Sequence, residues 1–251
     1  MLASIGPEIA AVVMQDDYYL DQSHPSPPDR RKTNYDHPQA FAGAAWWSPP
    51  GGVVGADGAS TEHASRVILA PMHPHQAVLH FWFEELTAKQ HFSKDAALDA
   101  TIRTRFEATL EAAARCELFA WRATPEGRLA EIIVLDQFSR NVYRDTPRAF
   151  AQDALALVLV QELVAGGQDR SLPSAQRVFA YMPTMHSESA LVHVQAVALF
   201  TQLGIQSNLD FELRHKAIID RFGRYPHRNA LMGRSSSAEE LAFLSEPGSS
   251  F

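Results

Sequence analysis

Residues 98–110 read LDATIRTRFEATL, and this stretch decides the fold. Apolar side chains recur in it at every fourth position: Leu98, Ile102, Phe106 and Leu110. In an α-helix these positions share one face, so the pattern predicts an amphipathic helix that packs against a core. Ser93 and Asp95 precede the pattern, and either side chain can cap the first free backbone amides.

The helical signal continues on both sides of this stretch. Residues 77–86, AVLHFWFEEL, are apolar around most of a helix, which predicts a buried element. Further helices are expected to begin at Pro125, at Thr146-Pro147, near residues 187 and 209, and at the capping box formed by Ser237 and Glu240. Glycines at 166–167, 204 and 223 are expected to end three of them. Because no strand-like alternation competes, residues 74–251 are predicted to form an all-α domain of antiparallel helices with short loops.

Residues 1–73 have a different character. Between residues 42 and 73 the chain is rich in Pro, Gly and small residues, and it shows no sustained periodicity. The Pro-Pro-Gly-Gly run at 49–52 cannot lie inside a helix. We therefore expect a poorly ordered linker at 42–73, preceded by a separate fragment at 1–41.

The composition is that of a globular protein, with 46% hydrophobic and 20% charged residues in a chain of 251. A formal net charge of −7 argues against general nucleic-acid binding, which needs clustered Lys and Arg. No apolar run approaches the roughly 18 residues of a transmembrane helix, and no basic residues precede the short apolar run at the N-terminus. We therefore expect neither membrane insertion nor secretion, and a cytoplasmic location. The single cysteine, Cys116, excludes an intramolecular disulfide and is expected to be a buried, inert thiol.

Three segments of the helical half carry more polar chemistry than packing requires. They read LDQFSRNVYR at 135–144, RVFAYMPTMHSE at 177–188 and HKAIIDRFGRYPHRN at 215–229. In the first segment, residues four apart are expected to lie along one side of a helix: Asp136 with Arg140, and Gln137 with Asn141.

In the second segment, Pro183 is expected to break the helix, so that the next helix opens with His186, Ser187 and Glu188. Ser187 can then serve as the N-cap, and the free amides of that N-terminus can hold an anion. The third segment gathers a basic set around a Gly and a Pro that force a turn: Arg221, Arg224, His227 and Arg228.

We expect the three segments to converge on one pocket for a small phosphate or carboxylate, because arginine forks bind such groups. The expected ligand-binding residues are Asp136, Gln137, Arg140, Asn141, Arg221, Arg224 and Arg228. His186, Glu188 and His227 are the expected catalytic residues, and His215 is a further candidate, since histidine transfers protons near neutral pH and Glu188 or Asp136 can orient it. The structural alternative is an intrahelical Asp136–Arg140 pair, with the arginines near Gly223 capping helix C-termini. His186, Glu188 and His193 resemble metal ligands, but no HExxH or Cys-rich spacing occurs, so no metal site is expected.

The quoted segments resemble the bacterial domain-of-unknown-function 924 family, in the runs LDQFSRNVYRDTPRAFAQD, RVFAYMPTMHSES and HKAIIDRFGRYPHRNALMGRSSSAEELAFL. The likeness covers about residues 74–245. It implies an all-α, tetratricopeptide-like stack of helices, and it implies no reaction.

A different resemblance covers about residues 7–41. GPEIAAVVMQDDYYLDQSHPSPPDRRKTNYDHPQAF is similar to an internal segment of uridine kinases. The phosphate-gripping GxxxxGK[ST] loop that should precede such a segment is absent, and only about ten residues come before the expected strand. We therefore expect an incomplete fragment without kinase activity.

Three functions remain open from the sequence. The first is binding of a small anionic metabolite, with or without catalysis, and the second is a helical-repeat module that binds a partner protein. The second has no internal 34-residue repeat to support it. The third is an inactive remnant of a nucleoside kinase. Neither a cofactor nor an oligomeric state follows from the sequence.

Overall fold

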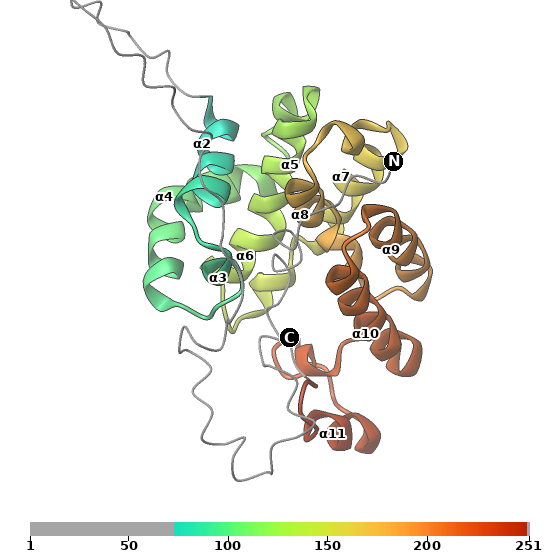
Figure 1. The fold of residues 1–251 in the computed structure, drawn as a ribbon. Helices are drawn as coiled ribbons and strands as arrows, with labels where there is room; N and C mark the ends of the chain where they lie inside the picture. The colour runs from blue at the N-terminus through green and yellow to red at the C-terminus, as the bar shows by residue number, and fades with distance from the viewer. Residues whose placement is uncertain (1–72, 250–251) are drawn as a thin grey trace, which may run out of the picture.

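The computed structural model describes residues 73–249, which form an all-helical stack without strands (Figure 1). The fragment at 1–41 and nearly all of the linker expected at 42–73 lie outside this range, so both stay predictions. The α-helices are α2 Pro74–His80, α3 Ala88–His91, α4 Ala96–Ala114, α5 Pro125–Ile133, α6 Ser139–Val142, α7 Asp153–Ala165, α8 Ser174–Met185, α9 Ala190–Leu203, α10 Gln206–Phe222 and α11 Ala238–Leu244. π-Helical turns lie at Phe81–Glu85 and Val134–Phe138, and 3₁₀ turns at Phe119–Ala123, Pro147–Phe150, Gln168–Ser171 and Pro226–Arg228. Within the described range, no helix has the length and apolar character needed to cross a bilayer.

Helix α4 forms as its sequence predicts. Its four apolar side chains at the four-residue spacing are all buried. Of the two candidate caps, Asp95 is the one used, and its Oδ1 accepts hydrogen bonds from the backbone amides of Ala97 at 2.8 Å and Leu98 at 3.2 Å. The cap satisfies amides that have no partner within the helix and so fixes where α4 begins.

An aromatic cluster joins the first half of the stack to α8. Phe81 and Trp82, in the π-helical turn after α2, are buried as the apolar run 77–86 predicts. The Phe81 ring lies 5.0 Å from that of Phe106 on α4, and the Trp82 ring lies 5.7 Å from Phe138 and 5.5 Å from Phe179. These edge and tilted contacts fix the π-helical turns Phe81–Glu85 and Val134–Phe138 against α4 and α8.

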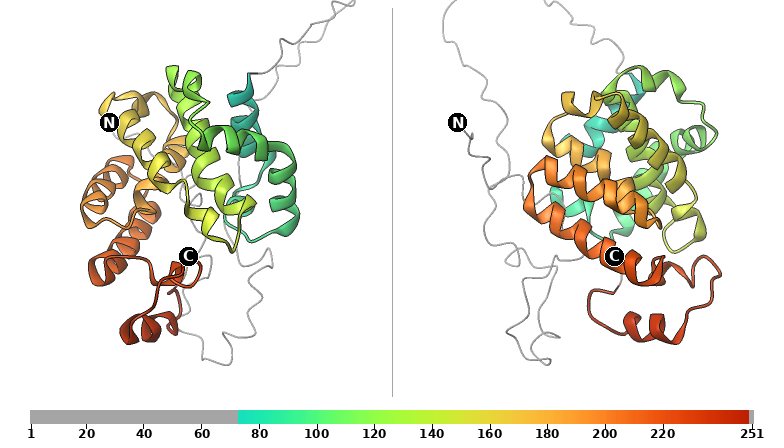
Figure 2. Two further views of the ribbon diagram at one scale, coloured as in Figure 1. Left: turned by 180° about the vertical axis from the view of Figure 1, so that it is seen from behind. Right: turned by 90° about the vertical axis from the view of Figure 1, so that its right-hand side faces the viewer.

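Helices α8, α9 and α10 lie side by side, while α11 packs at the far end of α10 (Figures 1 and 2). A smaller apolar cluster of Ile218, Ile219 and Tyr225 holds this end, and the Phe222 and Phe243 rings pack against it 5.1 Å apart. The tetratricopeptide-like character of the stack stays a prediction.

Two predicted helix boundaries were wrong. Pro147 begins only a 3₁₀ turn, and the long helix α7 starts later in the chain, at Asp153. Phe150, which ends the 3₁₀ turn, packs its ring against the guanidinium groups of Arg140 and Arg228. Pro183 does not break its helix but lies inside α8, which ends at Met185. A proline in the last turn forfeits few hydrogen bonds, and burial of residues 178–185 outweighs that loss.

Two further expectations need correction. Helix α9 begins after Ser189, so the expected N-cap Ser187 lies in the preceding loop, and His186 is the C-cap of α8. Cys116 is exposed, with a φ of 60°, because α4 ends before it in a tight turn. The expectation of a buried thiol was therefore wrong.

Candidate functional site

The first polar segment brings a carboxylate into the interior. Asp136 lies in the π-helical turn Val134–Phe138, and its side chain is only 1% exposed. Its neighbours Leu135 and Phe138 belong to the core. A π-helical turn inserts one extra residue into a helix and so re-aims its side chains, and such turns recur at functional sites.

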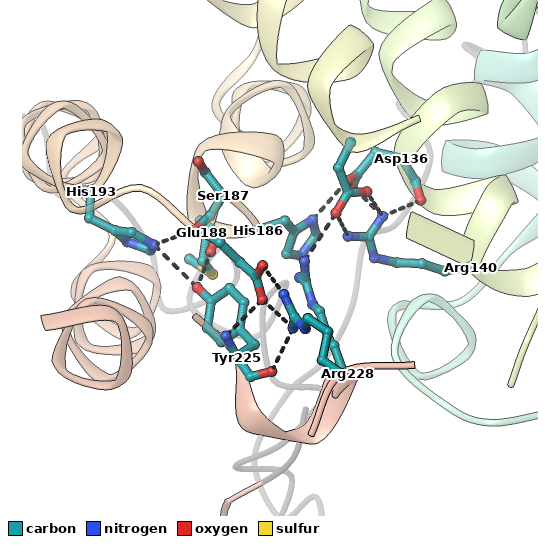
Figure 3. Close-up of polar contacts among 11 residues, drawn as sticks. Asp136, Arg140, His186, Ser187, Glu188, His193, Tyr225 and Arg228 are labelled. Carbon is teal, nitrogen blue, oxygen red and sulfur yellow. Dashed lines mark hydrogen bonds and ion pairs between the residues drawn. The ribbon is translucent and has the colours of Figure 1, made fainter. Parts of the chain in front are cut away.

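Three side chains surround the Asp136 carboxylate, and Figure 3 labels two of them, His186 and Arg140. His186 Nδ1 lies 2.7 Å from Oδ1, Gln137 Nε2 donates to Oδ2 at 2.6 Å, and Arg140 Nη1 donates to Oδ1 at 3.0 Å. Burial acts to raise the pKa of Asp136, but the Arg140 charge and His186 outweigh it and hold that pKa below its usual range. Asp136 is therefore ionised at neutral pH.

The imidazole of His186 has one nitrogen, Nε2, that makes no hydrogen bond with the described residues. Burial lowers its pKa, although Asp136 acts in the opposite direction, so the ring is neutral near pH 7. An ionised carboxylate only accepts hydrogen bonds, and therefore Nδ1 carries the proton and donates it to Asp136. Nε2 then holds the lone pair, and no described residue is hydrogen-bonded to it, while the side chain is 14% exposed.

A second carboxylate links two arginines beside this pair. Asp153, in the first turn of α7, accepts from Arg140 Nη1 at 3.0 Å and Nη2 at 3.1 Å, and from Arg228 Nη1 at 3.2 Å. The Arg228 guanidinium lies 4.6 Å from the Phe150 ring centre and 4.5 Å from that of Tyr225. Its side chain is 7% exposed, and its buried Nε has no hydrogen-bond partner.

Glu188 holds the segment that carries Arg228. Its Oε1 accepts from the Tyr225 backbone amide at 2.8 Å, and its two oxygens accept from Arg234 at 2.5 and 2.8 Å. Burial acts to raise the pKa of Glu188, but the hydrogen bonds from Arg234 and Tyr225 bring it below the ordinary value. These contacts make Glu188 a clamp between the α8–α9 loop and residues 223–234. Its predicted catalytic role is untested.

A buried chain of polar groups supports this clamp, as Figure 3 shows in part. His193 Nδ1 lies 2.7 Å from Glu212 Oε1, and its Nε2 lies 2.9 Å from the Ser187 carbonyl and 3.2 Å from the Tyr225 hydroxyl. That hydroxyl donates to the Met185 carbonyl at 2.5 Å. The chain fixes α9 and α10 against the loop that contains His186 and Glu188.

Three other predicted site residues, Asn141, Arg221 and Arg224, have separate surroundings, whereas the rings of His227 and His215 lie beside Tyr225. Asn141 donates to Asp99 on α4, Arg221 pairs with Glu239, and Arg224 pairs with Glu240. The two last contacts bind α11, so neither arginine belongs to the group around Asp136. His227 lies near Tyr225, with rings 5.6 Å apart, and burial together with Arg228 lowers its pKa to about 3. His215 is buried, and its Nδ1 lies 2.9 Å from the Phe211 carbonyl.

The structure thus unites Asp136, Gln137, Arg140, His186, Glu188, His227 and Arg228 across the three predicted segments. Sequence reasoning missed Asp153, Tyr225 and Arg234, which complete the network. Nothing in the local sequence marks Asp153, because its role depends on arginines distant in the chain. Among residues 73–249, no group of three or more His, Cys, Asp or Glu side chains is arranged to hold a metal ion.

A cavity of about 290 Å³ lies away from this group, against Phe81, Leu86 and the exposed Arg105–Glu85 pair. The charged residues that line it are this pair and Asp95, the N-cap of α4, and none of the three contacts the group around Asp136. The polar network therefore remains the candidate site on the strength of its chemistry.

A family model described as a bacterial protein of unknown function, DUF924, matches residues 78–248. The chain belongs to this family. A solved structure, that of the protein of unknown function ATU0120 from Agrobacterium tumefaciens, is 36% identical to this chain and superimposes with a TM-score of 0.65. That match covers 68% of this chain and 96% of the other. Every residue of the polar network lies within the DUF924 match.

Curated relatives match only a short segment. Uridine kinases of Clostridium perfringens (strain SM101) and Enterobacter sp. (strain 638) are 64% and 56% identical over 36 and 37 residues. The first match covers 14% of this chain and the second 15%, and the chain spans 17% of the length of each kinase. The resemblance is thus confined to a fragment, as expected.

Proposed function

We propose that this DUF924 domain binds a small anionic metabolite, a phosphate or a carboxylate, beside His186, and that His186 exchanges a proton with it. One observation carries the proposal. The Asp136–His186 pair leaves Nε2 without a hydrogen bond among the described residues, and the buried Nε of Arg228, in the same polar network, also has none. Buried polar groups without partners are uncommon and favour a site for a ligand.

The roles follow from the contacts. Asp136 fixes the tautomer of His186 and stabilises the imidazolium that forms when Nε2 accepts a proton. Arg228 supplies a planar donor held in place by Asp153 and by two aromatic rings. Arg140 compensates Asp136 and keeps it ionised. Such a set fits general acid–base chemistry on a small oxyanion.

A thermal-shift screen tests the proposal. The panel contains phosphate, sulfate, nucleotides, sugar phosphates, dicarboxylates and uridine. A ligand at about 100 times its Kd stabilises the folded state by about 2.7 kcal/mol, which is a clear rise in Tm. We expect at least one anion to shift the Tm of the wild type.

Two variants locate the binding. Arg228→Met removes the candidate donor while Asp153 keeps Arg140, and Arg221→Met removes an arginine that pairs with Glu239 at α11. The ligand shift should vanish in Arg228→Met and persist in the Arg221→Met control. A flat screen, or equal shifts in both variants, refutes the anion site and favours the alternative of a protein-interaction module.

A further inference from the structure

The charges of the candidate site cancel. Three carboxylates, those of Asp136, Asp153 and Glu188, are paired with three guanidinium groups, those of Arg140, Arg228 and Arg234. The neighbouring His186 and His227 both have lowered pKa values, so they add no charge near pH 7. An anion that enters this site meets no net positive charge. Because burial weakens the screening by solvent, one uncompensated negative charge there is costly.

His186 is the group best placed to supply the missing charge. Its Nδ1 already touches the ionised Asp136, and its Nε2 has no hydrogen bond among the described residues. A proton on Nε2 would face the bound anion, and the imidazolium would lie between that anion and Asp136, with a negative group on each side. His227 is less suited, because its strongest charged neighbour is the cation Arg228.

The surroundings of His186 on every side agree with this choice. Asp136 and Arg140 face it from the α5–α6 region, Asp153 from α7 and His215 from α10. Arg228 and His227 come from the 3₁₀ turn at Pro226–Arg228, and a positive charge on His186 acts to lower the pKa of His227. Of the six groups, the carboxylates Asp136 and Asp153 favour an imidazolium, and the cation Arg140 opposes it. A bound anion beside Arg228 shifts this balance toward the protonated ring.

We infer that the site takes up its anion together with one proton, which binds to Nε2 of His186. The inference rests on the proposed function and defines its ligand class: an oxyanion that is fully ionised in solution, such as a carboxylate or a phosphate monoester dianion. The balance is simple. Solvent supplies the proton, one N–H bond forms, the anion pairs with the imidazolium, and both leave together unless the proton passes to the ligand.

Isothermal titration with sulfate tests the inference, with malonate as a second probe. Both stay fully ionised above about pH 7, so any proton taken up belongs to the protein. Titrations in two buffers of different ionisation enthalpy give the number of protons bound. We expect about one proton per anion, and an affinity that falls about tenfold per pH unit between roughly pH 7 and 8.5.

Variants and spectroscopy assign the proton. His186→Asn should bind the probes more weakly, without proton uptake, whereas uptake should persist in His80→Asn, which removes an exposed histidine that lies near Glu85. Nitrogen-15 NMR of the wild-type imidazoles gives the same answer without a substitution, because the Nε2 signal of His186 should move to the protonated position when sulfate is added.

The possible failures are distinct. If a probe binds without proton uptake, the inference is overturned and the proposed function stands. The same holds if proton uptake is lost in His227→Asn and kept in His186→Asn. If neither probe binds at any pH, the inference fails, and the thermal-shift screen decides separately whether the proposed function stands.

Discussion

Arg140→Met is the substitution that most directly tests the buried network. Arg140 Nη1 donates to the Asp136 carbonyl at 2.8 Å and to its carboxylate at 3.0 Å, and both terminal nitrogens bind Asp153. Methionine keeps much of the apolar stem but none of these donors. The variant therefore leaves Asp136 buried with one positive partner fewer.

The expected loss follows from what each carboxylate keeps. Removal of one member of a buried ion pair costs about 3–5 kcal/mol. In this variant Asp136 keeps its hydrogen bonds to Gln137 and His186, and Asp153 keeps its bond to Arg228. The lower end of this energy range therefore applies. We expect the free energy of unfolding to fall by roughly 3 kcal/mol near pH 7.5, where His186 is neutral.

The loss should shrink in acid. Arg140 lowers the pKa of His186, so its removal raises that pKa and lets an imidazolium compensate Asp136. A folded-state pKa raised above the unfolded value of about 6.5 adds stability that is present below that value and disappears as the pH rises through the folded pKa. The deficit near pH 5.5 should therefore be clearly smaller than the deficit near pH 7.5.

Urea denaturation followed by circular dichroism measures both values. With a slope near 2 kcal/mol per molar urea, the loss near pH 7.5 moves the midpoint by roughly 1.5 M. Arg148→Met is the control, because its exposed pair with Glu111 contributes about 0–1 kcal/mol. A loss below about 1 kcal/mol for Arg140→Met, or a loss that grows in acid, refutes the assignment of Arg140 as the compensating charge of Asp136.

Two further predictions concern the scaffold of the site. Glu188→Gln should lower the free energy of unfolding by roughly 1–3 kcal/mol, because the charged bonds to Arg234 and the Tyr225 amide weaken. Since the Glu188 pKa is depressed, urea titrations should show this difference at neutral pH and its loss as the pH falls below about 4. Gly127→Ala should lower Tm despite the higher helix propensity of alanine, because a Cβ there would lie 2.1 Å from the Trp121 carbonyl oxygen. A Tm that is unchanged or raised in scanning calorimetry would contradict that steric argument.

Helix positions could be predicted wherever local chemistry decides them. Asp95 caps α4, Ser237 and Glu240 form the capping box of α11, and Gly204 and Gly223 end α9 and α10 in left-handed conformations. Each of these features depends on residues within a few positions of one another. The prediction failed at Pro183, where burial of the surrounding residues outweighed a local signal.

The site was predictable only in part. The three segments do meet, and the Asp136–Arg140 pair has the spacing of a helical neighbour pair. Arg221 and Arg224 resembled the other arginines in composition, yet α11 supplies Glu239 and Glu240 to them. The sequence could not separate these arginines from Arg228, because partners far along the chain decide which of them is buried.

The sequence by itself determined the all-α class, some of the helix caps and the family, because these depend on periodicity, local hydrogen bonds and residue identity. The tertiary structure alone decided that Asp136 holds His186, that Asp153 links Arg140 to Arg228, and that Glu188 clamps the segment at Tyr225. The physical reason is the environment of these charges. A carboxylate, a guanidinium or an imidazole acquires its protonation state and its role from burial and from the charges packed against it, and only the folded chain brings those together.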